Sequence, residues 1–191
     1  MRHHLPLAFA ILVYASAMAC SRSSPVAAPE FTTTATVKDI MDSIVDPGAD
    51  GIWDAVEIVA TLEGVTEKMP KTDDEWKALR RHAIAVIETG NLLIIPGRHI
   101  AQPGEQAVDG RVDLQPEEIE GLVNQDRAAW AKLARGLHDA GVQNLDAIQS
   151  RNVKQLIDAG EALDNACESC HKKYWYRNDP SGALSPPSAL R

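Results

Sequence analysis

The stretch Cys167-Glu168-Ser169-Cys170-His171 carries more structural information than any other part of this 191-residue chain. Two cysteines three residues apart project from nearly the same side of a helix. Both thiols can therefore reach the two vinyl groups of one porphyrin, and the histidine that follows can ligate its iron. Cys-x-x-Cys-His is the attachment signature of c-type haem, so the sequence predicts one covalently bound haem c per chain.

Paired cysteines also occur in redox motifs and in zinc sites. A thioredoxin-like motif requires a βαβ setting, and structural zinc requires four nitrogen or sulfur ligands at matching spacing. Neither pattern surrounds Cys167 and Cys170. We therefore expect haem attachment at these two cysteines.

The N-terminal stretch predicts export from the cell. Residues 1–19 combine a basic start at Arg2, an apolar run and small residues, as in a secretory signal peptide. Two cleavage sites compete. Ala17-Met18-Ala19 is an A-x-A-like site, whereas the same residues followed by Cys20 resemble a bacterial lipobox, in which Cys20 is the lipid anchor. Both interpretations place the protein in the periplasmic space, and the second tethers it to a membrane as a lipoprotein.

Composition predicts one folded domain between two unstructured segments. Residues 20–33 are rich in Ser, Pro, Ala and Thr, as in a flexible tether. Residues 34–179 have the size of a single domain, and residues 180–191 have too few apolar side chains to fold. The net charge of −8 argues against nucleic acid and against adsorption on anionic lipid, so a lipid anchor is the expected membrane contact.

Hydrophobic periodicity predicts four helices and no strands. Thr72 with Glu75 forms a capping box at the start of the second helix. Pro47 interrupts the first. The expected helices span residues 36–59, 72–95, 116–148 and 152–174. Together they predict an all-α, up-down-up-down four-helix bundle with the covalent haem in its core and helix one kinked near Pro47.

A kinked four-helix domain with Cys-x-x-Cys-His in its last helix resembles the class II cytochromes c, the cytochrome c′ family. The resemblance covers about residues 34–178 and rests on the pentapeptide, on Tyr174 three residues beyond His171, and on Met41 in the first helix. It implies a haem held between helices, with His171 as one axial ligand. On the other face, the resemblance implies either Met41 as the second ligand of low-spin iron or an apolar residue that leaves the iron five-coordinate.

The chain departs from this family at Val37 and Trp175, where Arg is often found. Arg98 is a candidate contact for a haem propionate, although an exposed loop arginine is an equal interpretation. His82, His99 and His138 are rivals of Met41 as the sixth ligand. We expect them to lie at helix edges or in a loop instead.

The resemblance implies a one-electron carrier that is not an enzyme. The sequence contains no phosphate-binding Gly-rich loop and no locatable catalytic constellation. The expected redox partners are a membrane dehydrogenase or quinol oxidoreductase and a terminal acceptor. An alternative is a five-coordinate haem protein that binds nitric oxide or carbon monoxide, with Met41 only packing over the haem. A third is a dedicated subunit of one enzyme complex, and the sequence leaves open whether two chains form a homodimer.

Overall fold

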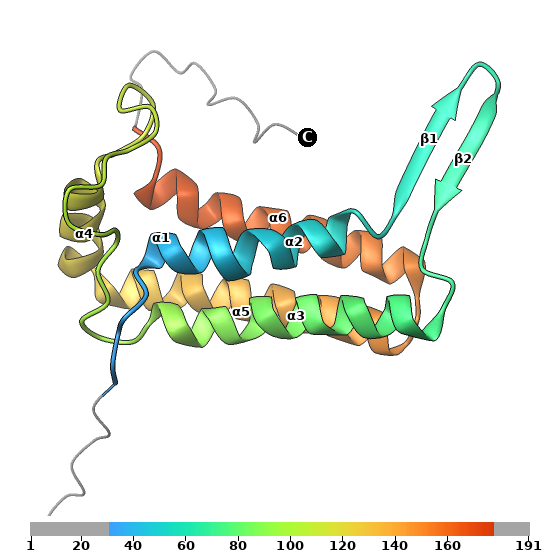
Figure 1. Ribbon diagram of the computed structural model, residues 1–191, viewed down its shortest axis with the longest axis horizontal. Helices are drawn as coiled ribbons and strands as arrows, with labels where there is room; N and C mark the ends of the chain where they lie inside the picture. Colours follow the sequence, from blue (N-terminus) through green and yellow to red (C-terminus); the bar gives the residue numbers. More distant parts are fainter. Residues whose placement is uncertain (1–30, 178–191) are drawn as a thin grey trace, which may run out of the picture. The chain divides into compact units, whose positions relative to one another are not determined.

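The computed structural model describes residues 31–177 (Figure 1). The expected signal peptide, the candidate lipid anchor Cys20 and the expected tail from residue 180 lie outside the described residues, as does most of the expected tether.

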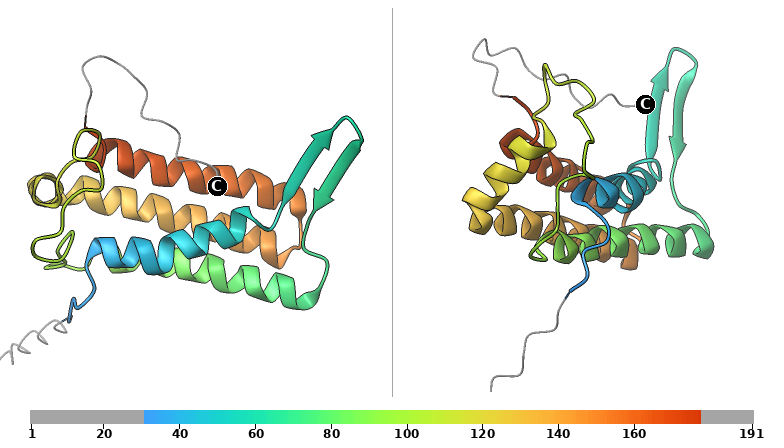
Figure 2. Two further views of the ribbon diagram at one scale, coloured as in Figure 1. Left: turned by 45° about the horizontal axis from the view of Figure 1, so that its top comes forward. Right: turned by 60° about the vertical axis from the view of Figure 1, so that its left-hand side comes forward.

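The described residues are mainly helical. In chain order the elements are α1 (Val37–Ile40), the π-helix η1 (Met41–Val45), α2 (Asp46–Trp53), β1 (Glu57–Thr61), β2 (Gly64–Lys68), α3 (Asp73–Leu93), α4 (Pro116–Gln125), α5 (Arg127–Gln149) and α6 (Val153–Tyr174). Helix α3 packs along α5, α5 packs on α6, and α2 packs on α3 and touches α6 (Figures 1 and 2). Between residues 31 and 177, no helix is both long and apolar enough to cross a membrane.

The predicted all-α, up-down-up-down four-helix bundle is wrong. β1 and β2 form a two-stranded antiparallel sheet, in register from Glu57 opposite Lys68 to Thr61 opposite Gly64. The first helix accordingly ends at Trp53 rather than near residue 59. All ten strand residues are exposed, so no half-buried face imposes the alternation of apolar and polar residues by which a strand is normally predicted.

The starts of α3 and α6 were predicted from the sequence, and the start of α5 was not. Thr72 and Glu75 form the expected capping box, in which the Glu75 carboxylate accepts the Thr72 amide at 2.7 Å. α6 begins directly after Asn152, where the helix was predicted to start, and the Asn152 side chain accepts the Gln155 amide at 3.1 Å. The helix predicted over 116–148 is instead divided at Asp126, whose carboxylate accepts the Ala129 amide at 2.9 Å. The Asp126 carboxylate takes the place of a backbone carbonyl of α4 as the acceptor for this amide. The backbone hydrogen bonds of α4 therefore end here, and α5 begins as a separate helix.

The irregularity expected near Pro47 begins earlier, at Met41. The Asp46 amide donates to the Met41 carbonyl, and this five-residue step makes a π-turn. A proline lacks an N–H group, and its ring crowds the carbonyl four residues earlier, here that of Ser43. A wider turn immediately before Pro47 accommodates both effects within a continuous helical segment.

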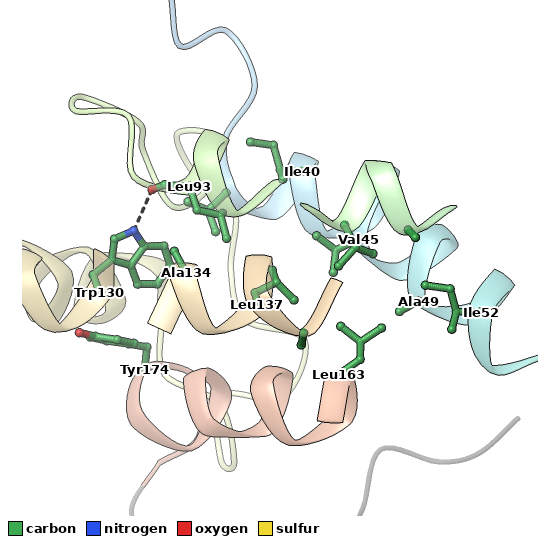
Figure 3. Packing of buried hydrophobic residues seen from close by; sticks show 14 of the residues in the cluster. Ile40, Val45, Ala49, Ile52, Leu93, Trp130, Ala134, Leu137, Leu163 and Tyr174 are labelled. Atoms are coloured by element: carbon green, nitrogen blue, oxygen red, sulfur yellow. Dashed lines mark hydrogen bonds between the residues drawn. The ribbon is translucent and has the colours of Figure 1, made fainter. Parts of the chain in front are cut away.

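One hydrophobic core joins the long helices. Figure 3 shows side chains of η1, α2, α3, α5 and α6 converging around Leu137 and Leu163. The Trp130 indole N–H donates to the Leu93 carbonyl at 2.8 Å, and its ring meets that of Tyr174 edge-on, with 5.3 Å between the ring centroids. These contacts tie the end of α3, the start of α5 and the end of α6 to one another.

Glycines permit the closest approach between α3 and α5. A Cβ atom at Gly90 would lie 2.7 Å from the Ala134 carbonyl oxygen and 2.7 Å from the His138 Cβ. A Cβ atom at Gly141 would lie 2.8 Å from the Ile87 Cγ1. The two helices can therefore lie this close only while both positions lack a side chain.

Replacing Gly90 with alanine should lower the free energy of unfolding by about 1–3 kcal/mol, because α3 and α5 must move apart. The matched control is Gly136→Ala on α5, where an added Cβ meets nothing within 4 Å. This control should raise the stability by about 0.5–1 kcal/mol through helix propensity. Denaturant unfolding of the two variants measures both changes, and equal effects would contradict the packing described.

Candidate haem attachment site

The two cysteines lie on the face of α6 that packs against the core. Cys167 and Cys170 are half-buried and contact the core cluster, as does Ala166 beside them. Leu163, one turn earlier, and Tyr174, one turn later, are fully buried. The helical spacing of three therefore places both thiols on one inward stripe, as the sequence predicts.

Burial keeps both thiols protonated. It raises the pKa of Cys167 to about 12, and the nearby Asp164 carboxylate adds to this effect. Burial also raises the pKa of Cys170 to about 11. A redox cysteine pair or a metal-bound thiolate normally has a lowered pKa in an electropositive setting. The surroundings of Cys167 and Cys170 have the opposite effect.

His171 is held as a neutral imidazole next to two aromatic rings. Burial lowers its pKa, and Glu168 and Asp46 oppose this effect only in part. The ring centroids of Trp175 and Tyr176 each lie 6.1 Å from that of His171. Within residues 31–177 no hydrogen bond engages the imidazole nitrogens, so an uncharged ring nitrogen is free to ligate a metal.

Asp46, the first residue of α2, was not predicted from the sequence. Its carboxylate acts electrostatically on both Cys167 and His171. The pKa of Asp46 is itself raised by burial and by the neighbouring Asp42. The start of α2 and the end of α6 therefore face each other across the site, a proximity that only the tertiary structure reveals.

Met41, the first residue of η1, also packs against the hydrophobic core. Its side chain is partly buried and packs against the core cluster that Cys167 and Cys170 also contact. It opens the π-turn whose closing amide is that of Asp46. Met41 thus precedes by one turn the carboxylate that influences His171, and its ligation of a haem iron stays a prediction.

The residues that follow α6 are held against a loop and the start of α4. Trp175 and Arg177 make these contacts with the segment 110–118. The Leu114 amide donates to the Trp175 carbonyl at 2.8 Å, and the Arg177 guanidinium pairs with Glu118 at 2.6 Å. The hydroxyl of Tyr176, just beyond the end of α6, donates to Glu168 at 3.1 Å, which fixes a side chain inside the pentapeptide.

The remaining candidate residues have partners elsewhere. Arg98 donates its guanidinium N–H groups to the backbone carbonyls of Leu92 and Ala35, so its contact with a propionate stays a prediction. The ring of His82 lies against Gly51 of α2. His99 pairs with Glu120 at 3.0 Å and His138 with Asp139 at 2.9 Å.

Trp53, the last residue of α2, has a side chain that is 37% exposed. Its indole N–H donates to the Gly160 carbonyl at 3.1 Å. This bond joins α2 to α6, two helices with much less mutual contact than α5 and α6. Trp53 therefore links the last turn of α2 to the middle of α6.

The donor set fits a covalently attached haem. Two neutral thiols on one helical stripe and an unbonded neutral imidazole match the chemistry of Cys-x-x-Cys-His attachment. A zinc site requires three or more such side chains around one ion. In the described part of the chain, no group of three or more His, Cys, Asp or Glu side chains is arranged to hold a metal ion directly. Two surface pockets, of about 170 and 20 Å³, are lined instead by residues of the 99–120 segment and its neighbours.

No family model, curated protein or solved structure matches this chain.

The Tyr174 hydroxyl is buried without a hydrogen-bond partner among the described residues. Tyr174→Phe should therefore leave the free energy of unfolding unchanged or raise it by up to about 1 kcal/mol, since an unpaired buried hydroxyl is unfavourable. Trp130→Phe, the control, loses the bond to Leu93 and should destabilise by about 1–3 kcal/mol. A comparable loss in Tyr174→Phe would show that the hydroxyl has a partner in solution.

Proposed function

We propose that this protein is a c-type cytochrome with a single haem that carries one electron at a time and turns over no substrate. The observation that carries the proposal is the placement of Cys167, Cys170 and His171 together on α6, with both thiols and the imidazole uncharged. The likeness to the class II cytochromes c is part of the same proposal.

The chemistry of attachment needs no oxidant. If haem binds, the thiols of Cys167 and Cys170 would each add across one vinyl group: a sulfur–carbon bond would replace the vinyl double bond, and the thiol hydrogen would pass to the other vinyl carbon. A protonated thiol supplies both atoms, and no electron is gained or lost. His171 then presents a neutral ring nitrogen to the iron.

When bound, the haem supplies a one-electron Fe(III)/Fe(II) couple. Met41 would supply a thioether to the iron, which would favour Fe(II) and raise the reduction potential relative to two histidines. Two protein ligands in both oxidation states keep the structural change on electron transfer small. The Asp46 carboxylate acts electrostatically on His171, and its negative charge would favour the oxidised iron.

The proposal includes export of the protein across the bacterial inner membrane. Haem is attached to exported apocytochromes on the far side of the bacterial inner membrane, which agrees with the predicted signal peptide. The electron comes from a reduced membrane dehydrogenase or quinol oxidoreductase and leaves to an oxidised terminal acceptor. Cys20, if lipidated, holds the domain beside a membrane.

Ligation of the haem iron by Met41 can be tested by absorption spectroscopy. The oxidised protein should show a weak sulfur-to-iron charge-transfer band in the far red, and Met41→Ala should abolish this band and turn the iron high-spin. Met69→Ala is the control, because Met69 lies after β2, on the far side of the hairpin from Met41 in sequence, and should leave the spectrum unchanged. An unaltered spectrum in Met41→Ala would rule out ligation.

Carbon monoxide separates the electron carrier from a gas-binding protein. The reduced protein should bind little carbon monoxide, because Met41 occupies the position that the gas needs, whereas Met41→Ala should bind it rapidly. Absorption spectra before and after addition of the gas measure both. Rapid, tight binding by the unaltered protein would contradict the carrier and favour the gas-binding alternative.

A further inference from the structure

The β1–β2 hairpin is the part of the structure that the proposed function does not use. It links α2 to α3 and projects away from the helices (Figures 1 and 2). Its base lies near the turn between α5 and α6, where Arg151 pairs with Asp73 at 2.6 Å. Cys170 and His171 lie near the other end of α6, so the hairpin and the candidate haem site occupy opposite ends of the fold.

Apolar side chains gather on one face of the hairpin. Residues directly opposite each other in an antiparallel pair share a face, so Ile58, Ala60 and Val65 lie on one face, in line with Leu62 in the turn. The one charged residue on this face is Glu67, opposite Ile58 at the base of the hairpin. The exposed fractions are 59% for Ile58, 64% for Val65 and 103% for Leu62. A two-stranded hairpin alone is at best marginally stable in water, and an unsupported apolar face marks an interaction surface.

The two edges of the hairpin differ. β2 starts at Gly64 and ends with Glu67 and Lys68, and charges and glycine discourage further strand pairing. β1 reads Glu-Ile-Val-Ala-Thr, with one charge at its first position only. An edge strand of this kind, exposed and rich in β-branched residues, readily accepts another strand. β1 is therefore the edge open to pairing.

We propose that β1 pairs antiparallel with β1 of a second copy of this chain, with Val59 on the two-fold axis. Ile58 then faces Ala60 of the second copy, and Glu57 faces Thr61. Val56, just before the strand, faces Leu62. No like charges stand opposite each other in this register, a situation that would destabilise the pair. Shifting the axis to Ala60 would set Glu57 against Glu63.

An anionic lipid surface is a poor partner for this edge. The hairpin carries Glu57, Glu63 and Glu67 against the single Lys68, so an anionic bilayer would repel it. Pairing of two copies gives four strands, beyond the three needed for an independently stable sheet. Because the two copies are related by a two-fold axis, each β1 edge is used up in the pair, and the assembly stops at a dimer.

The contact area of two five-residue strands is small, so the dimer should form reversibly and depend on concentration. Because the hairpin lies away from the α6 pentapeptide, the second copy does not cover the candidate haem site of either chain. The inference does not rest on the proposed function, and it holds or fails whether or not haem is bound.

Sedimentation velocity over a concentration series tests the proposal. The purified protein should carry Cys20→Ser, which excludes an intermolecular disulfide or a lipid at that residue. Val59→Lys places two ammonium groups face to face on the axis and should weaken dimerisation about tenfold or more. Thr66→Lys is the matched control. Thr66 is exposed and lies opposite Val59 on the same face, but on the β2 edge, so dimerisation should be unchanged.

Disulfide trapping gives an independent measurement. Paired Cα atoms in an antiparallel sheet lie about 4.5–5.5 Å apart, which suits a disulfide. In the Cys20→Ser background, mild oxidation should therefore cross-link Val59→Cys into a covalent dimer and leave Thr66→Cys monomeric.

Three results would overturn the proposal. The first is a monomer at every concentration together with no preferential cross-linking at position 59. The second is a dimer that both lysine variants retain equally, since another surface would then be responsible. The third is binding to neutral phosphatidylcholine vesicles by the Cys20→Ser protein that Val59→Lys abolishes while the protein stays monomeric, because the hairpin would then insert into lipid.

Discussion

The inward stripe of α6 is the constraint on which the structure and the proposed chemistry both depend. Leu156, Leu163 and Tyr174 on this stripe are buried in the core, and they fix the rotation of the helix about its axis. The same rotation turns Cys167 and Cys170 inward, because three-residue spacing keeps them on one side. Burial then keeps the thiols and the adjacent imidazole uncharged. Packing and site chemistry therefore have a single cause.

Local signals in the sequence predicted a substantial part of the fold. The starts at Thr72 and Asn152 were predicted correctly because capping depends only on residues within one turn. The hairpin was missed because neither of its faces is buried, and periodicity reports burial rather than strand formation. The break at Asp126 was missed because an apolar stripe continues on both sides of it.

The candidate site was predictable only in part, for a related reason. Cys167, Cys170 and His171 are adjacent in sequence, and their spacing alone indicates their shared use. Asp46 is distant in sequence and meets them only when α2 is placed beside α6. The contact of Tyr176 with Glu168 likewise depends on how the chain turns after α6 ends. The π-turn at Met41 could be anticipated from Pro47 as an irregularity but not as a type of turn.

Covalent attachment of one haem to α6 is the central claim, and the intact mass of the exported protein tests it most directly. The account predicts a mass above that of the mature polypeptide by one haem, retained after extraction with acidified acetone and lost when Cys167 and Cys170 are both replaced by alanine. A mature protein with the mass of the bare polypeptide, or one that gives up its pigment to the solvent, would contradict the account.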